Sequence, residues 1–383
     1  MGTSRHVVIG AGLAGAATAF HLARRGHETT VVERSCPAAP DGSSHGSARI
    51  LRFAYADPFY AGLVVRSEAG FDELERLTGR QLLRRTGALD HGALRGTRQL
   101  AQVLQACGVE HELVPVAEAD RRWPGFAVEG EVLWQPGAGV VDAEATVHAL
   151  LGLAEQHGAQ VLQGWPVAQV ESLEHSAGSA ARYRLDSDDG RTLEAASVVV
   201  AAGAWLPDLL RRLPLPLSFV ARMPALRVSQ EQVFHFPHRA APGAQDGPMP
   251  TSIHHREDIL AYSLPGGRDA GHRGQKVAEM NGGRQILSAA DQDGVVDPAN
   301  RRRVVRYVER HLPGLVPEPY AETTCLFTST PTEDFVIDRV DGITLVSACS
   351  GHGAKFTPLI GEVAADIATG GPGLDRFRLR SPD

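Results

Sequence analysis

The sequence predicts an α/β protein: a discontinuous Rossmann-like domain joined to a second domain that is mainly antiparallel β. A strand, a glycine turn and a helix open the chain, and strand-to-glycine turns recur in its middle and near its C-terminus. The segments between them have short, alternating strand patterns. We therefore expect the first domain to comprise residues 1–85, 141–210 and 325–383, and the second to comprise 86–140 and 211–324.

The first unit reads as β-α-β. "HVVIG" (6–10) is a continuous apolar run, typical of a strand buried on both faces. The alanine-rich stretch 11–26 predicts a helix, with basic residues in its last turn and Gly26 at its end. "HETTVVE" (27–33) predicts the second strand. The Pro-, Gly- and Ser-rich stretch 34–47 predicts a long irregular loop, which in a compact domain is often functional.

The same periodicity and turn patterns predict helices and strands in the rest of the chain. Helical periodicity spans 57–79 and 142–159, the second starting after the capping residue Asp142. A buried strand within 197–205 runs into a glycine turn. The remaining predicted elements are a helix at 298–311 and a strand, glycine turn and helix within 342–370.

Composition limits the partners. Hydrophobic residues make up 43% and charged residues 22% of the 383 residues, as in soluble globular proteins. The 45 acids outnumber the 38 Lys and Arg, for a net charge of -7, which argues against nucleic acid or an anionic membrane as the main partner. No apolar stretch is long enough to span a bilayer. We expect a cytoplasmic protein.

Neither the cysteines nor the histidines predict a metal site. Cys36, Cys107, Cys325 and Cys349 form no close pair, so no disulfide framework or zinc site is expected. The histidine-rich stretches 235–238 and 254–255 have no ligand spacing and are interpreted as surface.

The N-terminal glycines predict a dinucleotide site. Gly10, Gly12 and Gly15 form GxGxxG between a strand and a helix, where they permit a tight turn, close approach of a pyrophosphate and close helix–strand packing. The helix N-terminus offers N–H donors to phosphate. Glu33 ends the second strand, where an acid accepts hydrogen bonds from ribose hydroxyls. This pattern leaves NAD and FAD open as cofactors.

Six ordered motifs carry a resemblance over the whole chain: "VVIGAGLAGAATAFHLARRGHETTVVER", "DGSSHGSARILRFAY", "RRWPG", "AAGAW", "TTCLFTSTPTEDFVID" and "CSGHGAKFTPLIGEV". Together they resemble the monomeric sarcosine oxidase and N-methyltryptophan oxidase family within the D-amino-acid oxidase-like superfamily. The resemblance implies FAD as the cofactor, oxidation of a secondary amino acid, and a monomer. It makes the first domain the FAD-binding domain and the second the substrate domain.

The resemblance also assigns roles to single residues. Cys325 matches the cysteine that carries FAD covalently, and Lys276 matches the lysine beside the flavin where O2 is reduced. The expected catalytic residues are Lys276, Arg52, Lys355 and Arg49. The expected cofactor-binding residues are Gly10, Gly12, Gly15, Glu33, Arg34, Ser43, Ser44, His45, Arg49, Val167, Gly203, Cys325, Gly351, Gly353 and Lys355. The expected substrate pocket comprises Arg52, Tyr55, Tyr262, Met280, Phe327 and Lys355.

Local chemistry supports some of these roles. Arg52 interrupts the apolar run "ILRFAY", where an arginine is costly unless it is paired, so it is either a structural ion pair or a clamp for a carboxylate. Lys355 is expected in the first turn of a helix, where the dipole disfavours a cation, and this suggests function. Arg49 could be structural, and Lys276 on local sequence alone is an ordinary lysine. The other three cysteines are interpreted as structural, core-type residues.

Two residues depart from the family pattern. Met280 and Phe327 stand where sarcosine oxidases have a histidine and a tyrosine, which makes the expected pocket more apolar. We therefore expect a larger apolar or cyclic secondary amino acid, oxidised to the imine with reduction of O2 to H2O2. Three alternatives remain at this stage: a flavin dehydrogenase that uses a partner acceptor, a non-catalytic FAD-binding scaffold, and an NAD-dependent enzyme.

Overall fold

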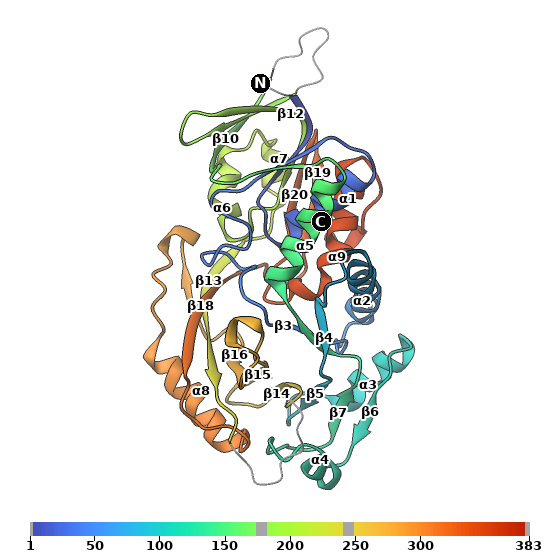
Figure 1. Cartoon of the computed structure of the whole chain (residues 1–383), viewed down its shortest axis with the longest axis vertical. Coiled ribbons are helices and arrows are strands. Elements are labelled where there is room, and N and C mark those ends of the chain that lie inside the picture. The colour runs from blue at the N-terminus through green and yellow to red at the C-terminus, as the bar shows by residue number, and fades with distance from the viewer. Residues whose placement is uncertain (1–2, 174–181, 240–248, 380–383) are drawn as a thin grey trace.

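Two large sheets lie one above the other along the long axis of the molecule (Figure 1). The computed structural model describes residues 3–173, 182–239 and 249–379. The upper sheet has eight strands and the lower sheet nine, and a small three-stranded sheet accompanies them.

The eight-stranded sheet joins segments that are distant in sequence. Its path is β10-β11-β12-β1-β2-β9, and β20 also pairs with β12 and with β19. Strands β9, β2, β1, β12 and β20 are mutually parallel, whereas β10, β11 and β19 are antiparallel additions. The bounds are β1 Thr3–Ile9, β2 Thr29–Val32, β9 Gln160–Leu162, β10 Val167–Ser172, β11 Tyr183–Ser187, β12 Thr192–Val200, β19 Val336–Val340 and β20 Ile343–Ser347.

Both faces of this parallel core are buried. Val8 and Val199 pack on the side of α1 (Leu13–Arg24), α5 (Ala143–Gln156) and α9 (Thr357–Ala368). Val7 and Val198 pack on the opposite side, against α6 (Leu206–Leu209) and α7 (Leu217–Val220). Successive strand residues point to opposite faces, so continuous β-branched runs are what such a sheet requires.

The nine-stranded sheet has the path β17-β13-β16-β15-β14-β5-β7-β6, and β18 pairs with β13 on its other side. All its pairings are antiparallel except β14 with β5. The bounds are β5 Ala88–His91, β6 Glu112–Val114, β7 Val132–Gln135, β13 Arg227–Phe236, β14 Thr251–His255, β15 Leu260–Pro265, β16 Gln275–Glu279, β17 Arg284–Ile286 and β18 Ala321–Ser329.

The remaining elements surround the two sheets. Helix α8 lies beside the nine-stranded sheet in the lower part of Figure 1, where α3 and α4 are also found. The helix bounds are α2 Pro58–Thr78, α3 Thr97–Ala106, α4 Val116–Arg122 and α8 Pro298–His311. The small antiparallel sheet, of order β3-β8-β4, consists of β3 Arg49–Leu51, β4 Leu83–Arg85 and β8 Gly139–Val141.

The predicted fold class is confirmed. Strands β1, β12 and β20 come from the three segments predicted to share one parallel sheet, and the second sheet is largely antiparallel. The helices predicted at 11–26, 57–79, 142–159, 298–311 and within 342–370 are α1, α2, α5, α8 and α9, and the bounds of α8 match the prediction at both ends. The residue boundaries of the two domains stay a prediction.

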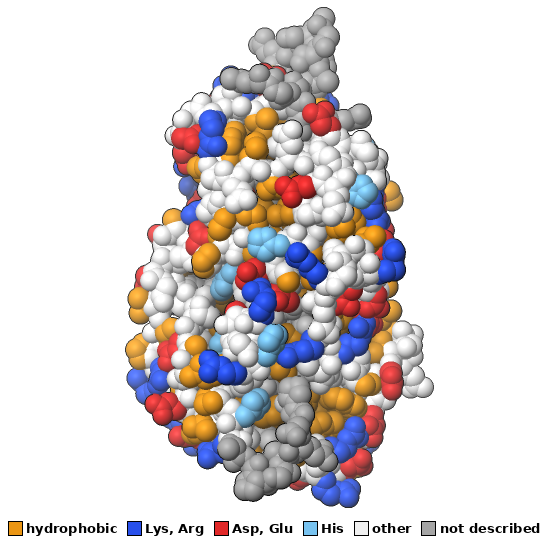
Figure 2. All heavy atoms as spheres, in the orientation of Figure 1, with side chains coloured by type: hydrophobic (Ala, Val, Ile, Leu, Met, Phe, Trp, Pro, Cys, Tyr) orange, Lys and Arg blue, Asp and Glu red, His pale blue; other side chains and the backbone are white. Residues whose placement is uncertain are grey.

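The surface shows no large region of one charge on the face seen in Figure 2, where basic and acidic side chains are interspersed. In the described ranges, no helix combines the length and the apolar character needed to cross a membrane.

Close packing of α9 on α1 gives a stability prediction. A Cβ on Gly361 would lie 2.4 Å from Cβ of Ala17, whereas one on Gly152 of α5 would meet nothing within 4 Å. Gly361→Ala should lower the free energy of unfolding by about 1–3 kcal/mol through overpacking. Gly152→Ala should raise it by up to about 1 kcal/mol, because alanine favours a helix. Chemical denaturation measures both, and equal stabilities for the two variants would contradict this packing.

Candidate active site

A cavity of about 470 Å³ separates the glycine turn after β1 from the nine-stranded sheet. Its wall includes the turn after β1, the loop 33–44, β3, the turns after β12 and β20, and side chains from β16 and β18. Segments from all parts of the chain therefore meet around one space.

The glycine turn is built so that its backbone is accessible. Gly10 has φ +99°, and a Cβ there would lie 2.5 Å from the Ala201 carbonyl oxygen. A Cβ on Gly15 would lie 1.9 Å from the Gly10 carbonyl oxygen, so Gly15 lets α1 pack against β1. A Cβ on Gly12 would lie 2.9 Å from Ser44 Oγ. The turn therefore requires glycine for packing as well as for close approach of a phosphate.

Glu33 stands at the end of β2 and lines the cavity. Its Oε2 accepts a hydrogen bond from the Ala11 N–H at 2.8 Å, and its Oε1 accepts one from the Ser35 N–H at 3.1 Å. Its neighbour Arg34 lies with Cζ 4.4 Å from the centre of the Trp205 ring. This end of the cavity thus presents an acid, a cation and an aromatic face.

The loop before β3 is held by Arg49. The Arg49 guanidinium donates to the Ser43 carbonyl at 3.1 Å and to the His45 carbonyl at 2.7 Å. Ser43 Oγ donates to the Leu326 carbonyl at 2.7 Å, and Ser44 Oγ accepts from the Leu13 N–H at 3.0 Å. Arg49 therefore has a structural task, and it also lines the cavity.

Two cations meet in the cavity without an acid between them. Lys355 is only 5% exposed, and its Nζ donates to the His352 carbonyl at 2.9 Å. Arg52 Cζ lies 4.8 Å and Lys355 Nζ 5.6 Å from the centre of the Tyr55 ring. Neither cation pairs with a carboxylate of the described residues. Burial, and then the Arg52 charge, holds the pKa of Lys355 well below its usual range.

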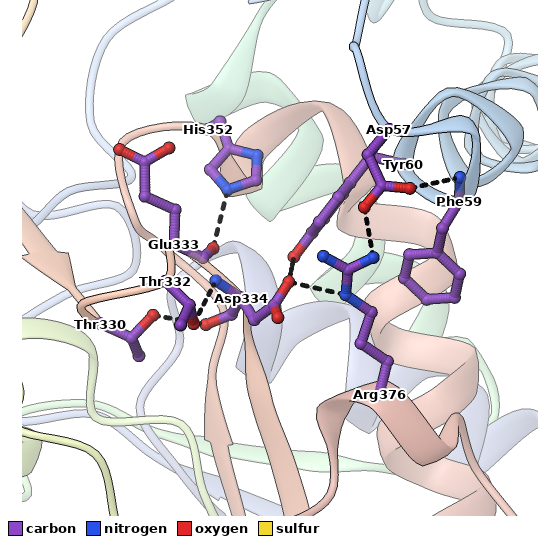
Figure 3. A network of polar contacts seen from close by, with 9 residues as sticks. All are labelled: Asp57, Phe59, Tyr60, Thr330, Thr332, Glu333, Asp334, His352 and Arg376. Atoms are coloured by element: carbon purple, nitrogen blue, oxygen red, sulfur yellow. Dashed lines mark hydrogen bonds and ion pairs between the residues drawn. The ribbon is translucent and has the colours of Figure 1, made fainter. Parts of the chain in front are cut away.

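A polar network fixes the turn that carries Lys355 (Figure 3). His352 Nε2 lies 3.1 Å from the Glu333 carbonyl, which can only accept, so Nε2 carries the proton. His352 Nδ1 then accepts from the Tyr55 hydroxyl at 3.0 Å. Burial and the nearby Lys355 lower the pKa of His352 to about 3, so the ring is neutral.

The outer part of this network connects the turn to α2 and to the C-terminal segment. The Tyr60 hydroxyl donates to Asp334 Oδ1 at 2.8 Å, and Arg376 Nε reaches the same oxygen at 2.9 Å. Arg376 also pairs with Asp57, whose Oδ1 caps α2 by accepting from the Phe59 N–H at 2.9 Å (Figure 3). Three distant segments thus hold the surroundings of Lys355.

A second buried lysine lies on β16. Lys276 is 8% exposed, and its Nζ donates to the Ala48 carbonyl at 3.2 Å. Burial, followed by the charge of Arg49, lowers the pKa of Lys276 to about 8. The Asp269 carboxylate partly opposes this shift, although it is bound to Ser47. Lys276 therefore can gain or lose a proton near neutral pH.

Cys325 lies on β18, half-buried and opposite Glu231 of β13. Burial raises the pKa of the Cys325 thiol, and the charges of Arg49 and Lys276 act in the opposite direction. The net shift is upward, and the two cations only limit the cost of forming the thiolate, the reactive form of cysteine.

The wall beyond the cations is apolar. A Cβ on Gly351 would lie 2.8 Å from Phe327 Cε2 and 2.9 Å from Met280 Cε, so both side chains reach the glycine turn. Tyr262 also lines the cavity, and burial raises the pKa of its hydroxyl well above the usual range. No ionised group is contributed by these side chains.

Most of the predicted site residues line the cavity. They are Gly10, Gly12, Glu33, Arg34, Ser43, Ser44, Arg49, Arg52, Val167, Gly203, Tyr262, Lys276, Met280, Cys325, Phe327, Gly351, Gly353 and Lys355. Gly15, His45 and Tyr55 lie behind the wall: Gly15 under the glycine turn, His45 near Arg49 and Lys276, and Tyr55 against the two cations. The roles of these residues stay predictions.

Sequence reasoning missed several lining residues: Asp41, Trp165, Trp205, Cys349 and His352. Trp205 ends the "AAGAW" motif and His352 stands within "SGHGAK", so a signal for both was present. Trp165 lies outside the motifs. The structural interpretation of Cys349 did not anticipate that it faces the cavity.

Three expectations were wrong. His235 is 8% and His254 0% exposed, so the histidine-rich stretches are not simply surface, because β13 and β14 are buried on both faces along most of their length. Cys36 is exposed, because it lies in the loop after β2 rather than in the core. Lys355 lies in the short 3₁₀ helix Gly353–Phe356, which precedes α9, rather than in the first turn of the α-helix.

Comparisons with known proteins show the family to which the chain belongs. The model of the family described as FAD dependent oxidoreductase matches residues 5–367. Monomeric sarcosine oxidase from Bacillus sp. (strain NS-129) is 29% identical over 375 residues, covering 95% of this chain and 92% of that protein. N-methyl-L-tryptophan oxidase from Yersinia pestis (strain Pestoides F) is 30% identical over 376 residues, covering 96% and 95%.

Solved structures share the fold. The open form of NikD, described as an unusual amino acid oxidase essential for nikkomycin biosynthesis, superposes with a TM-score of 0.84 at 23% identity, covering 100% of this chain and 98% of that one. L-proline dehydrogenase from P. horikoshii has a TM-score of 0.77 at 20% identity, covering 98% and 96%.

Proposed function

We propose that this chain, which belongs to the FAD-dependent oxidoreductase family of amino-acid and amine oxidases, oxidises a secondary amino acid with an apolar or cyclic side chain to the imine. Its relatives are named for sarcosine and for N-methyl-L-tryptophan, which are both N-methylated amino acids. The acceptor of the electrons is O2, which is reduced to H2O2.

The residues present fit FAD. The glycine turn exposes backbone N–H groups at the start of α1, where a pyrophosphate binds. Glu33 at the end of β2 is placed to accept from ribose hydroxyls, and the wall continues from there to Cys325 and Lys355. The buried Nε1 of Trp205 has no hydrogen-bond partner among the described residues, so its N–H is available to donate to a bound cofactor.

The single observation that carries the substrate class is a pair of cations without an acidic partner, the buried Lys355 and the partly buried Arg52. A buried cation without a counter-ion is costly, and both side chains lie where a ligand can reach them. A carboxylate would supply the missing negative charge and favour the protonated form of Lys355. The planar guanidinium of Arg52 suits a two-oxygen anion. An amino acid, rather than a simple amine, therefore fits this site.

The apolar wall favours a substrate with an apolar body. Met280 and Phe327 meet at Gly351, close to the turn that carries Lys355. A substrate anchored through its carboxylate would place a side chain or ring against them, and burying that surface contributes about 0.8 kcal/mol per CH2 group. Sarcosine has no side chain to bury.

Bound FAD would accept a hydride equivalent, the two electrons and the hydrogen of the C–H bond next to nitrogen, while the nitrogen gives up a proton; two electrons and two protons then convert O2 to H2O2. The protein's own contribution to the first step is orientation, because two cations fix the carboxylate and hold the reacting C–H in place. Their positive field also lowers the pKa of the substrate amine, which must be neutral to react. The cation on β16, Lys276, stabilises negative charge that develops on oxygen.

Cys325 is the proposed covalent anchor for the cofactor. It lies in the cavity wall on β18, where burial raises the pKa of its thiol and the charges of Arg49 and Lys276 partly oppose that shift. Cys349 lines the same cavity, but it accepts a hydrogen bond from the Thr328 N–H at 3.4 Å and is not proposed as the anchor.

Substrate choice is tested by peroxide production from sarcosine, larger N-methyl-L-amino acids, proline and pipecolate. We expect kcat/KM to rise with the apolar surface of the substrate, by about tenfold for each 1.4 kcal/mol gained against Met280 and Phe327. Sarcosine as the best substrate would contradict the proposed preference, while leaving oxidase activity itself in place.

The carboxylate clamp is tested with Arg52→Gln and Lys355→Gln. Each should raise KM by about 10- to 100-fold, because a hydrogen bond to a charged group contributes about 1.5–3 kcal/mol. Arg98→Gln is the control, since the Arg98 side chain is 81% exposed and should leave KM unchanged. A KM that stays at the wild-type value in both clamp variants would rule out this clamp.

The role of Lys276 is tested with Lys276→Met and separate measurement of the two half-reactions. Reoxidation of the reduced protein by O2 should slow by about 100-fold or more, whereas anaerobic reduction by substrate should change far less. In the wild type, reoxidation should slow as the pH rises through about 8, because Lys276 then loses its proton. Unchanged reoxidation would favour a dehydrogenase that uses another acceptor.

The covalent anchor is tested by the mass of the denatured protein. The wild type should retain the mass of FAD, Cys325→Ala should lose it, and Cys349→Ala should retain it. FAD that stays attached in Cys325→Ala would place the anchor elsewhere, and its absence from the wild type would show that the cofactor is held without a covalent bond.

A further inference from the structure

A second cluster of ionisable side chains lies away from the cavity, in the lower part of the molecule around β14, α8 and β7 (Figure 1). It consists of Glu129, His254 and His311, and one ligand atom of each lies within 4.8 Å of those of the others. His254 is on β14, His311 is the last residue of α8, and Glu129 precedes β7. They are far apart in sequence, so only the fold brings them together.

The distances within the cluster suit a small cation. His254 Nε2 lies 3.5 Å from Glu129 Oε2, and His311 Nδ1 lies 3.8 Å from Glu129 Oε1. Ligand atoms about 2.0–2.2 Å from a tetrahedral zinc ion are about 3.3–3.6 Å apart. The two distances to Glu129 are therefore at or just beyond this range, and all three ligand atoms lie within 4.8 Å of one another, so the side chains must draw slightly together to hold zinc.

His254 has a buried atom that points into this cluster with no hydrogen-bond partner. The residue is 0% exposed, and the one polar neighbour given for its Nε2 among the described residues is Glu129 Oε2 at 3.5 Å, too long for a well-formed hydrogen bond. Buried polar atoms in folded proteins are nearly always satisfied, so a missing partner needs an explanation. A metal ion at Nε2 would provide one.

The surroundings of His254 orient its ring. Its Nδ1 lies 3.1 Å from the hydroxyl of Tyr307, which is buried on α8 one turn before His311. If Nδ1–H donates to this hydroxyl, Nε2 is left as the free lone pair, the arrangement typical of metal-binding histidines. His91 stacks on the same ring, with centroids 4.1 Å apart, and its Nδ1 accepts from the Glu129 N–H at 3.4 Å.

Arg256 is the cation that competes for Glu129. It pairs with Glu129 Oε1 and also with Asp258, at 2.9 Å. Arg256 therefore leaves Glu129 Oε2, the oxygen nearer His254, available to an ion, and Asp258 offsets its charge. A carboxylate ligand that is held through its other oxygen is a common feature of metal sites.

The cluster is separate from the active-site cavity. Ile253 lines that cavity, and His254 is the next residue of the same strand, so the two side chains point to opposite faces of the sheet. His311 and Glu129 have side chains that are 14% and 37% exposed, which gives an ion access from solvent.

We propose that Glu129, His254 and His311 form a zinc-binding site that joins β14, α8 and the segment before β7. Two imidazoles and a carboxylate form a ligand set that zinc accepts, with water as the fourth ligand. Bound zinc would stabilise the domain around the nine-stranded sheet, because it binds the folded chain and not the unfolded one. This proposal is independent of the substrate assigned above.

The test is calorimetric titration of Zn²⁺ into the chelator-treated, flavin-containing protein. One zinc ion per chain is expected, together with a melting temperature that rises with zinc concentration. His311→Ala and Glu129→Ala should each weaken binding at least about tenfold. His148→Ala is the control, because His148 is an exposed histidine on α5 and far from this cluster in sequence.

The result is interpretable even if a variant is poorly folded. His254 is fully buried, and its substitution could disturb folding, so the test relies on variants of the two partly exposed residues, His311 and Glu129. An unchanged flavin spectrum shows that each variant is folded. The site is excluded if the wild type binds no zinc, or if His311→Ala and Glu129→Ala bind it as tightly as the wild type. Loss of binding in His148→Ala alone would place the zinc on the surface and also exclude it.

Discussion

Burial of positive charge without an acidic partner is the constraint on which the site depends. Lys355 and Arg52 lie against the same tyrosine ring, and neither is neutralised by a carboxylate of the described residues. Such an arrangement costs free energy in the protein alone, and it persists only if the surroundings fix it. The hydrogen bonds around His352, Tyr60 and Arg376 supply that rigidity (Figure 3). The proposed affinity for a carboxylate substrate, and its proposed orientation, both rest on this charge.

The parallel sheet makes this burial feasible. Its strands come from three distant segments, and their carboxyl ends deliver the glycine turn after β1, Glu33 after β2 and the Lys355 turn after β20 to one edge. Cofactors bind at this edge of doubly wound sheets. The nine-stranded sheet supplies the facing wall, with Lys276 and Cys325 on neighbours of the same strand, β13. Each sheet alone would present only half of the site.

The surroundings of the two buried lysines differ, which fits the different tasks proposed for them. Lys355 is tied to a fixed turn and shares its field with Arg52, which suits it to hold an anion in place. Lys276 has the His45 and Asp269 side chains nearby and a pKa of about 8, which suits it to respond to charge that appears only during a reaction. In the proposed reaction, one lysine would anchor the substrate and the other would respond to charge on oxygen within a single cavity.

The sequence by itself determined the fold class, the glycine turn and most of the cavity wall, because these depend on local periodicity, on glycines that no other residue replaces, and on motifs shared with a family. It did not determine which histidines are buried, that Cys349 faces the cavity, or that Lys355 precedes α9. Only the tertiary structure decided these points. Whether a strand residue is buried depends on which elements pack against each face of its sheet. Glu129, His254 and His311 are far apart in the sequence, so no local sequence pattern could predict that they meet.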